Sequence, residues 1–200
     1  MLTLLNEGDS SFDLDIKGVT LSIANFIRRA ILSDIYTFSI GDILIHENTT
    51  NMLDELLAHR LSMIPLVQLA QFDDDDILGM NDSDRYITID FRDQAYDFDL
   101  EARHLNMPEG FGVVDDFTKI VTIGFEQTVS LRCEIVEGCG KDHQRFQCVS
   151  HMTFKQLTDD SFLLHCVKIG NVSGEEIVRQ LLILIEDHLI GNLKQEKMNK

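Results

Sequence analysis

The amino-acid sequence predicts an α+β fold, in which a two-helix plus antiparallel-sheet domain is interrupted by an inserted antiparallel β domain. Three observations support this fold class. Apolar residues recur at helical spacing from Thr20 onward, segments with a two-residue repeat occupy residues 70–145, and a longer helical segment lies near the C-terminus. We therefore expect a discontinuous domain made of residues 1–45 and 146–200, with an inserted β-rich domain at residues 46–145.

The first part of the discontinuous domain is predicted from the spacing of its apolar residues. Residues 1–17 alternate weakly between apolar and polar positions, which is enough to add an edge strand. From Thr20 the repeat becomes helical and places four residues on one face, namely Ile23, Ile27, Ala30 and Ile31. The other faces of this helix carry polar residues, namely Asn25, Arg28 and Arg29.

The inserted domain is predicted from a repeat of two residues. Ile43 and Ile45 alternate with polar neighbours as in a strand, and a short helix over residues 52–61 follows, with Thr50 or Asn51 as its N-terminal cap. Later strands are expected to place one set of residues on their buried faces: Ile87, Ile89, Phe91, Phe98, Leu100, Val129, Leu131, Cys133 and Ile135.

The second part of the discontinuous domain combines two strands with a long helix. The strands are expected at residues 147–154 and 162–169. Ser173 and Glu176 then match a capping box, in which two side chains satisfy backbone N–H groups at the start of a helix. The helix is expected to cover residues 175–193.

This C-terminal helix is apolar over most of its circumference. Nine of the 14 residues from 177 to 190 are large aliphatic residues, whereas a helix that rests on one sheet needs only an apolar stripe. Four such side chains left in water would forgo about 8 kcal/mol of burial, at about 2 kcal/mol each. The helix is therefore either buried wholly within its own chain or packed in part on a second polypeptide, and we expect the second arrangement.

The composition favours protein partners over nucleic acid. Of the 200 residues, 44% are hydrophobic, so the chain can bury a core, and its net charge is −17 at pH 7. Nucleic-acid binding depends on Lys and Arg that neutralise phosphates, so we expect no direct contact with DNA or RNA. No apolar stretch approaches the roughly 20 residues that cross a bilayer, and the N-terminus does not match a secretory signal, so no membrane association is expected.

The titratable residues give little support to a metal or catalytic site. The four cysteines contain no C-x-x-C pair and are expected to be reduced thiols in the nucleus or cytoplasm. Cys139 and His143 have a zinc-like spacing, but zinc normally takes four ligands, so no metal and no cofactor are expected. The acidic run Asp73–Asp76 is predicted to be a solvated loop. The alternative function is a stand-alone acidic metal-binding protein or enzyme that uses this run.

A family resemblance is carried by the segment Val19–Leu66. Its matching elements are Asn25-x-x-Arg28-Arg29, Asn48-Thr49-Thr50, Asp54-Glu55-x-x-Ala58-His59-Arg60-Leu61 and Ile64-Pro65-Leu66. This order of motifs resembles the dimerisation-domain signature of the RNA polymerase α family, which contains the bacterial α chain, its archaeal counterpart and the third-largest subunit of eukaryotic RNA polymerase II.

A second match lies at residues 137–146, where five positions resemble the end of the inserted domain in the eukaryotic and archaeal members: Gly138, Gly140, Lys141, His143 and Phe146. The chain also departs from the family pattern. Tyr36 replaces a proline, Ser62 a glycine and Phe146 a tryptophan, and the cysteine cluster of many relatives is lacking. These departures fit a compact, divergent member, either cellular or virus-encoded; a viral one would act in the virion or the host-cell cytoplasm.

The resemblance implies a non-catalytic subunit of a multisubunit DNA-directed RNA polymerase. It implies a heterodimer with a smaller, eleventh-subunit-like chain, an assembly platform for the second-largest subunit, and contacts with other small polymerase subunits. The residues implied at the large-subunit contact are Asn25, Arg28, Arg29, Asp54, Glu55, His59, Arg60, Lys141, His143 and Phe146. Those implied in dimerisation, within the discontinuous domain, are Ile23, Ile27, Ile31, Ile177, Leu181, Leu184, Ile185 and Leu189.

Each of these contacts has an alternative within the chain. Arg28 and Arg29 can make charge-assisted bonds to a partner, or they can be solvated or paired with Asp34. The charged residues of the short helix can contact a large subunit or brace the loop before Pro65. The loop around Lys141 can present its side chains to a partner, with its glycines allowing a positive φ and close backbone approach, or it can be a simple β-turn.

Overall fold

The computed structural model describes three stretches of the backbone, residues 2–69, 85–92 and 95–198, and side chains only as far as residue 188. Within these stretches the fold is α+β, with three α-helices and antiparallel sheets, which confirms the predicted class. The acidic run Asp73–Asp76 lies outside the described residues.

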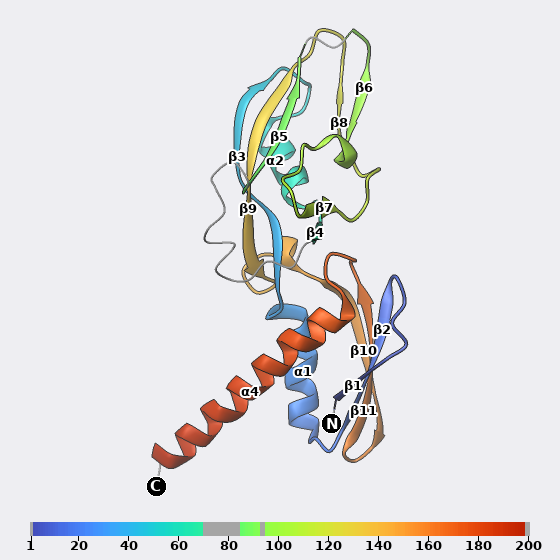
Figure 1. Ribbon diagram of the computed structural model, residues 1–200, viewed down its shortest axis with the longest axis vertical. Coiled ribbons are helices and arrows are strands. Elements are labelled where there is room, and N and C mark those ends of the chain that lie inside the picture. The colour runs from blue at the N-terminus through green and yellow to red at the C-terminus, as the bar shows by residue number, and fades with distance from the viewer. Residues whose placement is uncertain (1, 70–84, 93–94, 199–200) are drawn as a thin grey trace. The chain divides into compact units, whose positions relative to one another are not determined.

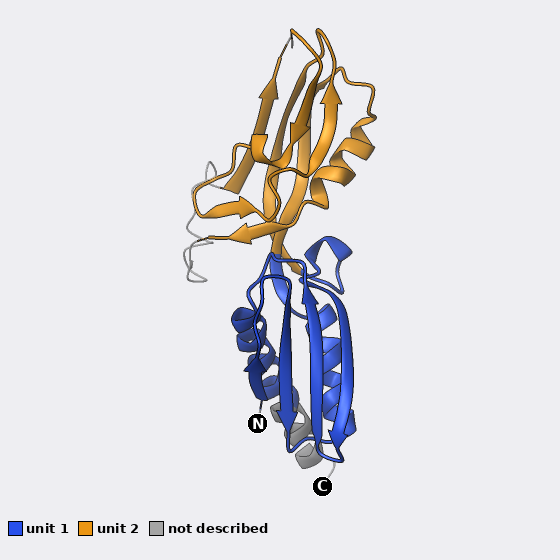
Figure 2. Ribbon diagram, turned by 90° about the vertical axis from the view of Figure 1, so that its right-hand side faces the viewer, with its two compact units in different colours: residues 1–37, 139–200 blue, residues 38–138 orange. Residues whose placement is uncertain are grey.

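The chain divides into two compact units, shown in different colours in Figure 2. Unit 1 contains residues 1–37 and 139–200, and unit 2 contains residues 38–138. These boundaries fall before the expected positions 45/46 and 145/146. The reason is visible in the core, because Ile40, Ile43 and Ile45 all pack with the apolar residues of unit 2.

Unit 1 is a four-stranded antiparallel sheet with two helices that cross beside it (Figure 1). The strand order is β1-β2-β11-β10, with bounds Leu2–Leu5, Ser11–Lys17, Ser161–Lys168 and Val149–Thr158. The helices are α1 (Leu21–Ser33) and α4 (Gly174–Met198). The expected N-terminal edge strand is therefore a hairpin, of which β1 lies at the edge of the sheet. β2 is an inner strand because it pairs with β1 on one side and β11 on the other, and every second residue, on its core-facing side, is buried, namely Phe12, Leu14 and Ile16.

Side-chain caps begin both helices of unit 1. Thr20 Oγ1 accepts a hydrogen bond from Ile23 N at 3.5 Å, and Ser173 Oγ accepts one from Glu176 N at 3.2 Å. The predicted capping box is only half formed, because the Glu176 carboxylate accepts from Arg179 Nε at 2.7 Å. The core beneath the helices joins both ends of the chain, and it includes Phe12, Leu14, Ile27, Ile31, Phe162, Leu164, Ile177 and Leu181.

The described residues of unit 2 form three small sheets and one α-helix. The three-stranded sheet has the order β3-β9-β5, with bounds Tyr36–Asn48, Val129–Cys139 and Tyr86–Phe91. Two pairs accompany it, β4 (Leu66–Gln68) with β7 (Phe111–Val113), and β6 (Phe98–Glu101) with β8 (Lys119–Ile123). The predicted inward faces are confirmed: seven residues are buried, Ile87, Ile89, Leu100, Val129, Leu131, Cys133 and Ile135, while Phe91 and Phe98 pack partly buried against them.

The helix of unit 2, α2 (Asp54–Ser62), starts later than expected. Its N-cap is Leu53, which makes no side-chain cap, so the predicted capping by Thr50 or Asn51 is wrong. Thr50 Oγ1 is instead held by Asn48 Oδ1 at 2.7 Å, within the turn that precedes the helix. Such local side-chain bonds compete with helix formation and delay its first turn.

Candidate protein-interaction surfaces

Half of the residues expected in dimerisation belong to the core of unit 1. Ile27, Ile31, Ile177 and Leu181 are each at most 1% exposed. Ile23, Leu184 and Ile185 are partly buried against that core, and the side chain of Leu189 lies outside the described residues. The seven described positions therefore stabilise the fold of unit 1, and three of them also reach its surface.

The apolar surface of α4 lies at two residues outside the predicted dimerisation set. Leu182 is 51% exposed and Ile183 is 50% exposed, although both belong to an otherwise apolar segment. The sequence indicated such an exposed apolar surface because the helix is apolar over most of its circumference. Of the two arrangements considered, the described part of α4 shows a helix that is only partly covered by its own chain.

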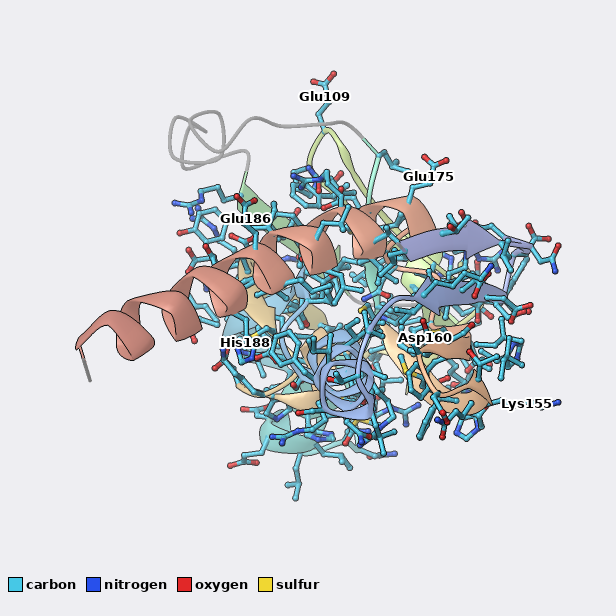
Figure 3. The ribbon with its side chains drawn as sticks, turned by 90° about the horizontal axis from the view of Figure 1, so that it is seen from below. Glu109, Lys155, Asp160, Glu175, Glu186 and His188 are labelled. Atoms are coloured by element: carbon cyan, nitrogen blue, oxygen red, sulfur yellow. The ribbon has the colours of Figure 1, made fainter. Side chains whose placement is uncertain are left out.

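Helices α1 and α4 contact each other through polar and aromatic groups beside this apolar surface. The rings of Phe26 and His188 stack with centroids 4.2 Å apart, and Figure 3 shows His188 and Glu186 on opposite sides of α4. Gln180 of α4 also binds the first residue of β3, just after α1, because its Oε1 accepts from Tyr36 N at 2.8 Å and its Nε2 donates to Tyr36 O at 3.2 Å. The two helices thus form one surface of defined geometry.

The polar residues of α1 remain available on the surface. Arg29 is exposed, while Arg28 and Asn25 are half-buried, and none of the three has an ion pair or side-chain hydrogen bond among the described residues. The alternative that the arginines pair with Asp34 does not hold. That carboxylate accepts from Ser33 Oγ at 2.9 Å and lies 3.3 Å from Lys141 Nζ.

The loop before β10 is anchored on the end of α1. Lys141 N donates to Ser33 O at 2.9 Å, and a Cβ added at Gly140 would lie 2.6 Å from Leu32 O. The expected close backbone approach is therefore present at Gly140, whereas neither Gly138 nor Gly140 has a positive φ. The hydrogen bond to Asp34 is the main reason why the pKa of Lys141 is raised above its ordinary value.

The remaining residues of this loop have different surroundings. His143 is exposed and caps the short 3₁₀ helix η3 (Gln144–Phe146), since its Nδ1 accepts from Arg145 N at 3.2 Å. Phe146, expected at a partner contact, is only 4% exposed, and Arg145 lies over its ring at 4.9 Å from the centroid. The aromatic ring is thus part of the interior of this chain, and Lys141 and His143 form the exposed part of the loop.

The charged residues of α2 are divided between internal and external roles. Asp54 Oδ1 accepts from Asn48 Nδ2 at 2.7 Å, and Arg60 Nη2 donates to Lys119 O at 2.8 Å. Both residues therefore brace unit 2. Glu55 and His59 are exposed one helical turn apart and have no side-chain partner among the described residues.

Known proteins similar to this chain are RNA polymerase subunits. The chain is 29% identical to the DNA-directed RNA polymerase subunit Rpo3 of Methanocaldococcus jannaschii, over 89% of its own length and 86% of that subunit. It is 30% identical to the DNA-directed RNA polymerase II subunit RPB3 of Schizosaccharomyces pombe, over 77% of its own length and 59% of that subunit.

The chain is a homologue of the α-like subunits of DNA-directed RNA polymerases. It is also 26% identical to the human subunit RPAC1 of RNA polymerases I and III, over 78% of its own length. The chain spans only about half of that subunit, 54%, as it does of several other relatives. No family model matches the sequence.

The homologues of this chain are structural subunits of their polymerases. Such subunits are not catalytic, because the nucleotidyl-transfer site lies in other chains of the enzyme. Within the described residues, no three side chains of the His, Cys, Asp and Glu types come together as metal ligands. Cys139 Sγ donates to Asp142 Oδ2 at 3.0 Å, and its pKa is raised, chiefly by burial. None of the described helices is long and apolar enough to cross a membrane.

Proposed function

We propose that this α-like chain pairs with a smaller related subunit and that the pair forms the assembly platform for the second-largest subunit of its polymerase. The observation that carries the proposal is the apolar surface of α4, Leu182 and Ile183, in a chain homologous to α-like RNA polymerase subunits. We refer to Leu182 and Ile183 as the α4 patch.

The α4 patch supports a dimer because its residues gain from burial. A fully buried Leu or Ile contributes about 2 kcal/mol relative to an exposed one, so covering two half-exposed side chains contributes about 2 kcal/mol in total. The half-buried Ile23, Leu184 and Ile185 add to the same helix pair. An apolar surface of this kind matches the apolar surface of a related helix pair, as in other dimers of homologous chains.

The polar groups of α1 support the second contact. Guanidinium groups form bidentate bonds to carboxylates and carbonyl groups, and such bonds fix the orientation of one protein on another. Arg28 and Arg29 have no such partner among the described residues of this chain. We assign them, together with Asn25, Glu55, His59, Lys141 and His143, to the second-largest subunit and the neighbouring small subunits.

The charge of the chain supports a role without direct nucleic-acid contact. A net charge of −17 repels phosphate backbones, so transcription by the complete enzyme would involve this subunit only through proteins. The homologues act in the nucleus or the cytoplasm. The four cysteines are free and buried, which fits a reducing compartment of either kind.

The proposal is tested by co-expression of the full chain with the smaller α-like subunit of the same source, followed by affinity purification. We expect Leu182→Asp with Ile183→Asp to weaken recovery of the partner by at least about tenfold, because each carboxylate would be buried against an apolar surface. Leu157→Asp is the matched control, because Leu157 is also 51% exposed but lies on β10. Partner recovery unchanged by the double substitution would rule out the α4 patch as the dimer contact.

A further inference from the structure

Two aromatic side chains of unit 2 are exposed at the same end of the β6–β8 pair. Tyr96, just before β6, is 70% exposed, and Phe125, just after β8, is 62% exposed. In Figure 1 this end of β6 and β8 is at the top of the picture. Large aromatic rings contribute much of the binding free energy of protein interfaces, and they make no such contribution while they remain exposed to water.

The antiparallel pairing of β6 with β8 brings the segments that carry Tyr96 and Phe125 to the same end of the strand pair. Phe98 pairs with Ile123 at this end, and Tyr96 and Phe125 each lie two residues beyond that pair. A hydrogen bond joins the same two segments, because Phe125 N donates to Asp97 Oδ1 at 3.2 Å. Tyr96, Asp97, Phe125 and Glu126 therefore form one surface, which we call the aromatic tip.

The turn that carries Phe125 has a fixed geometry. Gln127 holds it closed, since its Oε1 accepts from Gly124 N at 2.7 Å and its backbone N donates to Gly124 O at 3.1 Å. Glu126 has a φ of +57°, a left-handed conformation that residues other than glycine rarely adopt. The exposed ring of Phe125 is thus presented by a defined turn.

The charges at the aromatic tip are negative. Asp97 and Glu126 are exposed, and no Lys or Arg of the described residues pairs with either. Two other cations of unit 2 contact different carboxylates: Arg92 Nε lies 2.8 Å from Asp90 Oδ1, and Lys119 Nζ lies 2.7 Å from Asp99 Oδ1. An occupant of the tip should therefore be positively charged as well as able to stack on aromatic rings.

We propose that the aromatic tip of unit 2 is a docking site for an arginine-rich segment of another protein. A guanidinium group can stack on a ring of Tyr96 or Phe125 while it donates hydrogen bonds to the carboxylates of Asp97 or Glu126. The chain itself uses this contact at another place, where Arg103 lies over the ring of Phe117 at 5.3 Å from the centroid. The site lies in unit 2 alone and does not depend on the proposed dimer.

The test measures binding of a fluorescently labelled deca-arginine peptide to the full chain by anisotropy, at about 0.15 M salt so that distant charges are screened. We expect Tyr96→Ala with Phe125→Ala to weaken binding about tenfold, from two lost cation–π contacts. Deca-lysine should bind the unaltered chain more weakly than deca-arginine, because an ammonium group cannot stack as a plane. Phe117→Ala is the matched control, since Phe117 is 69% exposed in the same unit, and it should leave binding unchanged.

Several outcomes would overturn the proposal. Equal affinity of the double alanine variant and the unaltered chain would show that the rings are not used. A second variant, Asp97→Asn with Glu126→Asn, keeps the rings and suits the left-handed position, because Asn tolerates that conformation. Loss of binding in this variant alone would indicate simple charge attraction, and no binding of the peptide by the unaltered chain would remove the site altogether.

Discussion

The hydrogen bonds of Glu7 allow a quantitative test of how unit 1 is held together. Its Oε1 accepts from Lys168 Nζ at 2.9 Å, and from Gly174 N, at the start of α4, at 2.7 Å. The side chain of Lys168 is only 8% exposed and that of Glu7 28% exposed. One carboxylate therefore connects the turn between β1 and β2, the end of β11 and the first residue of α4.

The loss in the free energy of unfolding on removal of the Glu7 carboxylate follows from its two hydrogen bonds and from the charge of Lys168, which would remain without this partner. A hydrogen bond to a charged group contributes about 1.5–3 kcal/mol, and a carboxylate at a helix N-terminus adds about 0.3–1 kcal/mol. Glu7→Ala leaves Lys168 buried without its partner, so we expect a loss of about 3 kcal/mol in the free energy of unfolding. Glu7→Gln keeps an acceptor of the same size and should cost about 1–2 kcal/mol.

The pH dependence gives this prediction a distinct signature. The hydrogen bond from Lys168 is the largest cause that lowers the pKa of Glu7 below its ordinary value, with a further lowering from Gly174 N–H and an opposing effect of desolvation. A carboxylate with a lowered pKa contributes stability that is complete above its unfolded pKa. That stability is lost as the pH falls through the folded pKa. The difference between the unaltered chain and Glu7→Gln should therefore shrink on acidification below about pH 4.5.

The assay is urea denaturation followed by far-UV circular dichroism at neutral pH and at steps down to about pH 3. Glu175→Gln is the control, because Glu175 is an exposed acid in the first turn of the same helix. It should change the free energy of unfolding by no more than about 0.5 kcal/mol. Equal stability of Glu7→Gln and the unaltered chain at neutral pH, or a difference that persists unchanged in acid, would refute this account of Glu7.

Two further predictions concern the end of α1. Gly140→Ala should destabilise the chain by about 1–3 kcal/mol in the same assay, because the new methyl group would lie 2.6 Å from the backbone oxygen of Leu32. Gly8→Ala is the control, because a Cβ at that position would have its nearest atom 3.6 Å away. An equal loss in the free energy of unfolding for the two variants would contradict the prediction. Arg28→Glu with Arg29→Glu should prevent recovery of the second-largest subunit in a pull-down while the smaller partner is still recovered, and survival of both associations would exclude the role assigned to these arginines.

The sequence predicted those elements whose apolar residues recur at a regular spacing. The faces of β5 and β9 followed from their two-residue repeat, because every second side chain of a strand points into the core. The long helix α4 followed from its apolar run and from Ser173, which caps it as expected. Periodicity and capping depend on residues that are close in the chain, so both can be recognised from the sequence alone.

The sequence did not predict which of several neighbouring groups would take up a side chain. The cap of α2 could not be predicted from Thr50 because that hydroxyl is taken by Asn48 within the preceding turn. Phe146 was assigned to a partner contact from its place in a motif, but its ring is buried within this chain. The exposure of Leu182 and Ile183 was not predicted either, since sequence alone does not say which side of an apolar helix its own sheet will cover.

The proposed dimer surface depends on pairing between the two ends of the chain. β2 pairs with β11 residue by residue, from Ser11 opposite Val167 to Lys17 opposite Ser161. The core beneath α4 then joins Phe12 and Leu14 from the N-terminal part to residues after 161, as in a discontinuous domain. A chain that lacks either end cannot complete this sheet and therefore cannot orient α4. The α4 patch consequently depends on a folded unit 1 with both of its segments present, so partner binding would select chains in which the two segments have paired.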